Sequence, residues 1–189
     1  MPFTVDDFAQ LSTLVLDAWS SGLDRDWTAP AGTLEWSCFT TADHTIDCVF
    51  SYALFLASQK QDAYPNFGEL HARPDATPQD LVDGLRAVTT MLTAVIATAD
   101  PDVRAVIWHR PEAETAPPPD FAARGGLEMI LHAHDVCAGL GVPFEPPPGL
   151  CARLFEHTRH WPFQPQTPPT SDPWADLLER SGRSRAGGR

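Results

Sequence analysis

Four polar residues recur at helical spacing in the second half of the chain: Arg124, Glu128, His132 and Asp135. On a helix, residues three or four positions apart lie on one face, so these side chains would form a single polar stripe. A carboxylate and an imidazole one turn apart can share a metal ion. A third ligand candidate, His44, lies far upstream on another predicted helix, and helical bundles build metal sites from side chains that point inward from facing helices. The spacing therefore raises the hypothesis that His44, Glu128 and His132 meet around one ion.

The stripe also has a simpler explanation, as the solvated face of an amphipathic helix. Glu128 would then pair with Arg124 or His132 across one turn, which contributes roughly a few tenths of a kcal/mol, and no metal would bind. Against this, Leu127 and Leu131 flank the stripe and the opposite face carries no charge, so the helix has no better face for water. From the residues alone, both explanations stay open.

The four cysteines are interpreted as small packing residues. A histidine such as His44 is usually a surface residue or a satisfied core residue, and Cys48 follows it by one turn. Cys48 could be a fourth ligand or a reactive thiol, but a thiolate needs an electropositive setting. Together with Cys38, Cys137 and Cys151, it has no CxxC spacing, and four cysteines are too few for a secreted disulfide scaffold of this length.

The composition is that of one acidic domain. A chain of 189 residues can bury most of its apolar surface without metal or disulfide staples, so a metal here would serve function rather than folding. With 13 Lys and Arg against 25 Asp and Glu, the net charge of −12 disfavours nucleic acid and anionic membranes as partners. The start, MPFTVDDFAQ, lacks the features of a secretory signal, and nowhere do about 18 apolar residues follow one another. We expect a cytoplasmic monomer or homodimer.

Cap residues and apolar periodicity predict four principal helices. They cover residues 5–22 with Thr4 as cap, 41–60 with Thr40 or Thr41 as cap, 78–99 with Thr77 as cap, and 120–141, where Gly139 and Gly141 end the stripe helix. His44 lies in the first turns of the second helix. The third is the most regular, because Pro78 occupies its first position and its apolar residues keep a helical period throughout.

The remaining segments are predicted to be accessory or irregular. Short helices are expected at residues 150–161 and after Ser171 as cap, with a proline-rich linker between them. Residues 103–108 favour an extended backbone, but no second good strand is present to pair with them, so a connector is expected. Residues 181–189 have the composition of a flexible basic tail. The expected fold is all-α, a single four-helix bundle over residues 1–180 with short accessory helices and long Pro-rich connections.

The polar stripe and the segment around His44 resemble the motifs of a known family. The run WHRPEAETAPPPDFAARGGLEMILHAHDVCAGLG is similar to the motif of the DinB-like, mycothiol-dependent maleylpyruvate isomerase N-terminal superfamily: Arg, three residues, Glu or His, three residues, His, two residues, Asp. These positions fall on Arg124, Glu128, His132 and Asp135. The stretch LEWSCFTTADHTIDCVFSYA resembles the family's tryptophan-led start of the second helix, whose first-turn histidine corresponds to His44, and WADLLERSGR resembles its usual close.

The resemblance implies a DinB-like bundle that holds one divalent metal ion, zinc in the first place and nickel as the alternative. It implies His44, Glu128 and His132 as the ligands, with water completing the coordination, which leaves the open position that catalysis requires. Arg124 and Asp135 would not bind the metal but would support the ligands or the structure. Asp135 would do so by orienting His132 or by bonding a neighbouring helix. The family's thiol in actinobacteria is mycothiol, and the richness in Ala, Pro and Arg fits a high-GC source of this kind.

The implied activity is transfer of a metal-activated thiol, mycothiol in the family, to a small electrophile. A thiol-assisted isomerase of the maleylpyruvate type is the alternative. It is disfavoured because this sequence ends soon after the bundle, without the extra C-terminal domain that the isomerase uses in substrate recognition. An acidic protein also offers few cationic groups to hold a dicarboxylate, and Arg104, Arg110 and Arg124 are the nearest candidates in the sequence. A second alternative is a non-catalytic bundle that binds a metal or a small ligand, since fold does not imply function. A cavity open to a thiol would favour an enzyme, and one filled by Trp108 or Phe55 a binding module.

Overall fold

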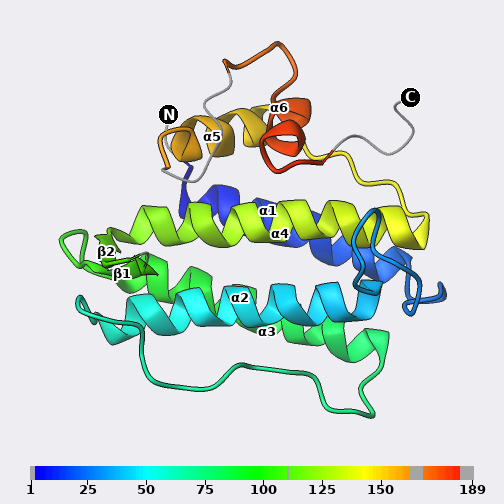
Figure 1. Ribbon diagram of the computed structural model, residues 1–189, viewed down its shortest axis with the longest axis horizontal. Helices are drawn as coiled ribbons and strands as arrows, with labels where there is room; N and C mark the ends of the chain where they lie inside the picture. Colours follow the sequence, from blue (N-terminus) through cyan, green and yellow to red (C-terminus); the bar gives the residue numbers. More distant parts are fainter. Residues whose placement is uncertain (1–2, 110, 162–167, 184–189) are drawn as a thin grey trace.

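Helices make up most of the protein in the computed structural model, which describes residues 3–109, 111–161 and 168–183 (Figure 1). Within these residues the chain forms six helices and two strands. They are α1 (Val5–Ser21), α2 (Cys38–Ser58), α3 (Pro78–Thr98), β1 (Ala105–His109), β2 (Ala113–Ala116), α4 (Pro118–Leu140), α5 (Pro148–Thr158) and α6 (Pro173–Arg180). The predicted all-α class is confirmed.

The four long helices form one bundle, in which α1 and α4 run in one direction and α2 and α3 in the other (Figure 1). The helices α1 and α2 each pack against both α3 and α4. Because α2 and α3 are parallel, residues 59–77 return along the length of the bundle, and this is the long connection that the sequence predicts (Figure 1). The short helices α5 and α6 pack against each other, and α5 also packs on α4.

The bundle encloses an apolar core. Phe8, Trp19, Leu85, Leu92 and Ile130 are fully excluded from solvent. Burying a side chain of this size stabilises the fold by about 1.5–3 kcal/mol. One helix in the described part of the chain, α3, is also long and apolar enough to cross a membrane by length and composition, a property that core helices share.

Two predicted helix starts are confirmed, and two are wrong. Thr4 and Thr77 cap α1 and α3 as expected, each in a capping box that Asp7 or Asp80 completes. The helix α2 is capped by Ser37, whose side chain accepts the backbone N–H of Thr40, so Thr40 and Thr41 lie inside the helix. The helix α6 is capped by Asp172 rather than Ser171, because the Asp172 carboxylate accepts the backbone N–H of Ala175. Several short polar residues lie near the start of α2 and of α6. The one whose backbone lies just outside the helix becomes the cap.

The predicted connector over residues 103–108 is wrong as well. Residues 105–109 form the strand β1, which pairs with β2 in an antiparallel hairpin that has an irregularity between Val106 and Trp108. The partner segment, AETA, lies between prolines and has no strand pattern of its own. The burial of Ala105, Val106 and Ile107 against the bundle holds the hairpin in place. Tertiary packing, and not strand propensity, forms this sheet.

Gly141 and Gly139 have different roles at the end of α4. Gly141 is the C-cap with a φ of +67°, a left-handed conformation that suits glycine. Gly139 remains inside the helix, where a Cβ atom would collide with the carbonyl oxygen of Pro30 and lie 2.5 Å from the sulfur of Cys38. The missing side chain therefore lets the loop before α2 pack directly on α4, one to two turns beyond His132.

The last part of the chain is only partly described. The helix α5 covers residues 148–158 rather than 150–161. Most of the predicted proline-rich linker, residues 162–167, and residues 184–189 of the predicted tail lie outside the described residues. Ser181, Gly182 and Arg183 follow α6, and Arg183 contacts Asp135 of α4.

Candidate metal centre

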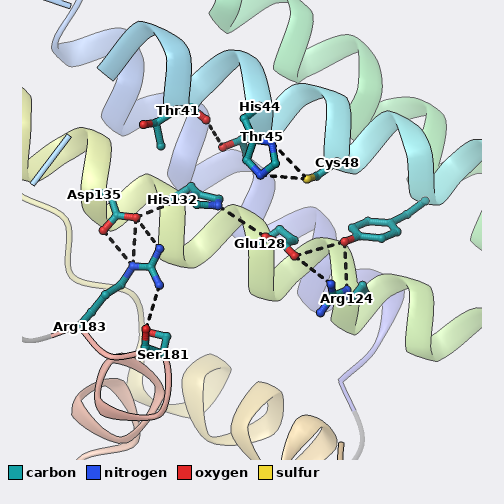
Figure 2. Close-up of polar contacts among 11 residues, drawn as sticks. Thr41, His44, Thr45, Cys48, Arg124, Glu128, His132, Asp135, Ser181 and Arg183 are labelled. Carbon is teal, nitrogen blue, oxygen red and sulfur yellow. Dashed lines mark hydrogen bonds and ion pairs between the residues drawn. The ribbon is translucent and has the colours of Figure 1, made fainter. Parts of the chain in front are cut away.

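His44, Glu128 and His132 meet where α2 packs against α4 (Figure 2). One ligand atom from each lies within 4.8 Å of the other two. The rings of His44 and His132 are arranged edge to face with 5.3 Å between their centroids, and Nε2 of His132 lies 3.6 Å from Oε2 of Glu128. Within the described ranges, this is the one group of three His, Cys, Asp or Glu residues so spaced. The structure thus brings together the three residues that the sequence singled out.

The polar stripe of α4 is not a freely solvated surface. The side chains of Glu128 and His132 are only 22% and 13% exposed. Leu127 and Leu131, which flank them, are buried. The stripe faces α2 because the helical period places these residues on one side of α4, and their apolar neighbours pack beside them. Their polar groups must therefore find partners inside the protein.

The two carboxylate oxygens of Glu128 have different surroundings. Oε1 accepts a hydrogen bond from the Tyr52 hydroxyl at 3.3 Å and lies 3.2 Å from the guanidinium of Arg124. Arg124 Nε also donates to the Tyr52 hydroxyl at 3.0 Å, which links all three side chains. Oε2 lies on the side of His132. Tyr52 and Arg124 therefore hold the carboxylate with one oxygen directed toward the imidazole.

The ring of His132 contacts Asp135, which is itself paired with Arg183. Its Nδ1 lies 3.3 Å from Oδ2 of Asp135, so that Nε2 faces Glu128 (Figure 2). Asp135 is 3% exposed and accepts three hydrogen bonds of 2.7–3.0 Å from the guanidinium of Arg183. Asp135 therefore contacts both His132 and Arg183, and Arg183 lies in the segment after α6 rather than in a neighbouring helix.

Burial and charge set the protonation of the cluster. Burial alone would raise the pKa of Glu128, but the hydrogen bond from His132 and the charge of Arg124 lower it to about 2. Burial disfavours protonated His132, yet its hydrogen bonds to Asp135 and Glu128 raise its pKa above the usual value. Burial, followed by the charge of His132, lowers the pKa of His44. At neutral pH the cluster thus contains the carboxylate of Glu128 and the neutral imidazole of His44, and a metal ion would compete with a proton for His132.

Cys48 lies beside the cluster without joining it. Its sulfur is 3.4 Å from Nε2 of His44, but Cys48 is not part of the group whose ligand atoms lie within 4.8 Å of one another. Burial, and next the charge of Glu128, raise the pKa of the Cys48 thiol well above its usual value. A protonated thiol at this place agrees with the packing role expected from the sequence. Cys38, Cys137 and Cys151 are buried.

An open cavity of about 380 Å³ borders the two histidines. It is lined by Leu34, Glu35, Trp36, His44 and His132. Trp108 and Phe55, which could have filled such a space, pack elsewhere: Trp108 against Trp161 and Phe55 against Tyr64. A small molecule in this cavity would lie beside both imidazole side chains.

Sequence reasoning missed two residues of this site and misplaced one histidine. Tyr52 follows Cys48 by one helical turn, so its place on the α2 face could have been found from spacing. Arg183 belongs to the predicted tail, and no local pattern connects it to Asp135. His157 was expected at the surface, but its side chain is 8% exposed and its ring bonds the backbone N–H of Phe3 and the carboxylate of Asp120. His134 points away from the stripe as predicted and packs edge to face against Trp174.

Comparison with known proteins supports the fold. No family model matches the chain, and no curated protein matches its sequence. The fold is similar to that in the crystal structure of a mycothiol-dependent maleylpyruvate isomerase with a histidine-to-alanine mutation, with a TM-score of 0.54 and 13% sequence identity. The similarity covers 81% of this chain and 70% of the isomerase chain. At this identity the likeness shows a related fold, the DinB-like bundle.

Proposed function

We propose that the protein binds one divalent metal ion, zinc before nickel, through His44, Glu128 and His132, and uses it to transfer a small thiol to an electrophile. The observation that carries this proposal is the convergence of two imidazoles and a carboxylate beside an open cavity. The solved structure with a similar fold is named as mycothiol-dependent, which makes mycothiol the first thiol to test.

The donor atoms suit zinc. Imidazole nitrogen and carboxylate oxygen bind Zn²⁺ at about 2.0–2.2 Å, so two ligands of a tetrahedral site lie about 3.3 Å apart. The 3.6 Å between His132 Nε2 and Glu128 Oε2 is close to this value. Nickel accepts the same donor types. Three protein ligands would leave one coordination position, as in catalytic zinc sites. The cavity borders two of the three candidate ligands, His44 and His132.

A bound divalent ion supplies the positive charge that stabilises a thiolate at neutral pH. In the transfer, the thiol gives up its proton, its sulfur forms a bond to the electrophilic carbon, and the leaving group departs with its electron pair. The chain's own residues prepare this step. Asp135 fixes the orientation of His132, and Tyr52 and Arg124 fix that of Glu128. Such partners behind the ligands hold a site in its productive geometry.

Isomerisation of maleylpyruvate is supported less than thiol transfer. A dicarboxylate needs cationic partners, and the cavity lining contains Glu35 and no Lys or Arg. Arg124, which was considered for this role, is bound to Glu128 and Tyr52. The electrophile that we propose is therefore not a dicarboxylate.

Metal analysis tests the ligand assignment. Protein purified without chelator or nickel resin should contain about one zinc or nickel ion per chain, and Glu128→Ala and His132→Ala should lose most of it. His134→Ala is the matched control, because His134 lies on the same helix and packs edge to face against Trp174, away from the cluster. If both ligand variants retain stoichiometric metal, the assignment is wrong.

A thiol assay tests the reaction. With mycothiol and 1-chloro-2,4-dinitrobenzene as a general electrophile, the metal-loaded protein should accelerate conjugation, and Glu128→Ala should abolish the acceleration. A protein that binds metal but accelerates no conjugation, with this or other electrophiles, would instead be a non-catalytic metal-binding bundle.

A further inference from the structure

The loop before α2 forms a rigid wall of the cavity. The N–H of Ala31 donates to the carbonyl of Trp36 at 2.9 Å, and the N–H of Cys38 donates to the carbonyl of Ala29 at 2.8 Å. An isolated β-bridge between Pro30 and Ser37 closes the same loop. These bonds fix the backbone on both sides of residues 32–35, so the side chains at the tip start from a fixed frame.

The same loop is pressed against α4 beside His132. Gly32 has a φ of +57° and lies so close to α4 that a Cβ would be 3.5 Å from Cα of Asp135. Ala31 is fully buried, and Gly139 admits the loop backbone on the next turn of α4. The wall is therefore pre-formed relative to His132, as expected of small-molecule sites.

Trp36 is the main recognition group on this wall. Its ring lies edge to face with that of His44, with 5.2 Å between centroids and 71° between planes. The residue is 47% exposed, and Leu34 lies beside it in the cavity lining. An indole that remains half in water next to two ligand candidates offers a surface on which a flat molecule can pack. Tryptophan is also the side chain that attracts cations most strongly through its ring.

The charges around the cavity are negative. Glu35 is exposed on the wall. On α2, Asp43 and Asp47 act on His44, and both hold the connection between α2 and α3 by accepting backbone N–H groups of residues 70 and 72. The arginines of the site, Arg124 and Arg183, are bound to Glu128 and Asp135. In the metal-free protein, a carboxylate that enters this cavity would meet Glu35, and no Lys or Arg lines the cavity.

We propose that the cavity binds an aromatic molecule that carries no negative charge, a cation more tightly than a neutral molecule. Trp36 supplies the stacking surface and Glu35 the charge preference. That the bound aromatic molecule is the electrophile rests on the proposed function. The binding preference itself does not require that the protein catalyses the transfer. Each unit of charge should change the affinity about fivefold, which corresponds to the roughly 1 kcal/mol that a solvent-exposed ion pair contributes at most.

Three probes of similar size test the preference: benzyltrimethylammonium, benzyl alcohol and benzoate. Isothermal titration calorimetry on the zinc-loaded and the metal-free protein gives their dissociation constants. The expected order of affinity for the metal-free protein is cation, alcohol, benzoate. Bound zinc adds two positive charges and can itself bind a carboxylate, so the zinc-loaded protein shows how far the metal changes this order. Trp36→Ala should weaken the cation at least tenfold, and Trp36→Phe should restore most of the binding. Glu35→Gln should weaken the cation about fivefold and leave the alcohol unchanged.

Two variants control for these changes. Phe67→Ala removes an aromatic side chain that is 76% exposed on the connection between α2 and α3. Glu112→Gln removes one negative charge at the β1–β2 hairpin, at the opposite end of the bundle from the loop before α2 (Figure 1). Neither should change the binding of any probe.

The outcomes separate this inference from the proposed function. If the metal-free protein keeps the order of affinities but purified protein holds no metal, the cavity assignment stands and the metal assignment fails. If zinc binds but benzoate binds as tightly as the cation to metal-free protein, or if Trp36→Ala changes nothing, the inference is overturned.

Discussion

Replacing Arg183 by Gln tests whether the segment after α6 holds His132 in place. The backbone of Arg183 is fixed independently of its side chain, because its N–H donates to the carbonyl of Leu178 at 2.8 Å and Gly182 takes the left-handed turn before it with a φ of +76°. The substitution therefore removes the guanidinium and leaves the turn. What it takes away is the ion pair with Asp135.

The structure sets the size of the effect. Removing one partner of a buried ion pair costs about 3–5 kcal/mol, because the other charge is left unpaired. Asp135 is 3% exposed, but Arg183 is 16% exposed and water can reach part of it. We therefore expect Arg183→Gln to lower the free energy of unfolding by about 2–3 kcal/mol. The double variant with Asp135→Asn should be more stable than the sum of the two single changes predicts, by about 1–3 kcal/mol.

Urea unfolding followed by circular dichroism at neutral pH measures all four proteins of this cycle, in the absence of metal. Arg73→Gln, which removes the same charge at an exposed position, is the control. A separate zinc titration should show Asp135→Asn binding at least tenfold more weakly, since Asp135 orients His132. A coupling free energy near zero, or equal stability of Arg183→Gln and Arg73→Gln, would refute the reasoning.

Three further predictions concern other contacts. The pKa of Asp7 is lowered because hydrogen bonds from Arg153 and from the helix cap outweigh burial, so its contribution is present above the usual pKa of 3.8 and is lost as the pH falls through the lowered value. Asp7→Asn should cost about 1–2 kcal/mol in urea unfolding at pH 7, a difference that shrinks as the pH falls below 3.8; a difference that does not change with pH would contradict this. Tyr52→Phe leaves two charged groups without their shared hydroxyl and should cost about 1.5–3 kcal/mol at pH 7; a loss below about 0.5 kcal/mol would show that the hydroxyl bonds contribute nothing. Gly139→Ala forces the loop before α2 away from α4 and should lower the free energy of unfolding by about 1–3 kcal/mol. Gly84→Ala, whose added Cβ meets only Ile46 at 3.4 Å or more, should be neutral or stabilising, and equal effects of the two substitutions would rule out the clash.

Local patterns in the sequence were sufficient to predict where the helices lie, though not every cap, and which side chains form the polar face of α4. A cap such as Thr77 bonds a residue three positions away, and Glu128 and His132 are one turn apart, so both features depend on neighbours along the chain. The helical period alone places these two side chains on one face.

Only the tertiary structure decided which distant groups meet that face. The packing of α2 on α4 sets His44 against His132, the turn at Gly182 brings Arg183 onto Asp135, and the missing side chain of Gly139 admits the loop that carries Trp36. The hairpin β1–β2 likewise exists because the bundle buries it. These contacts join residues that no spacing connects, since their geometry follows from how whole helices and loops pack in three dimensions.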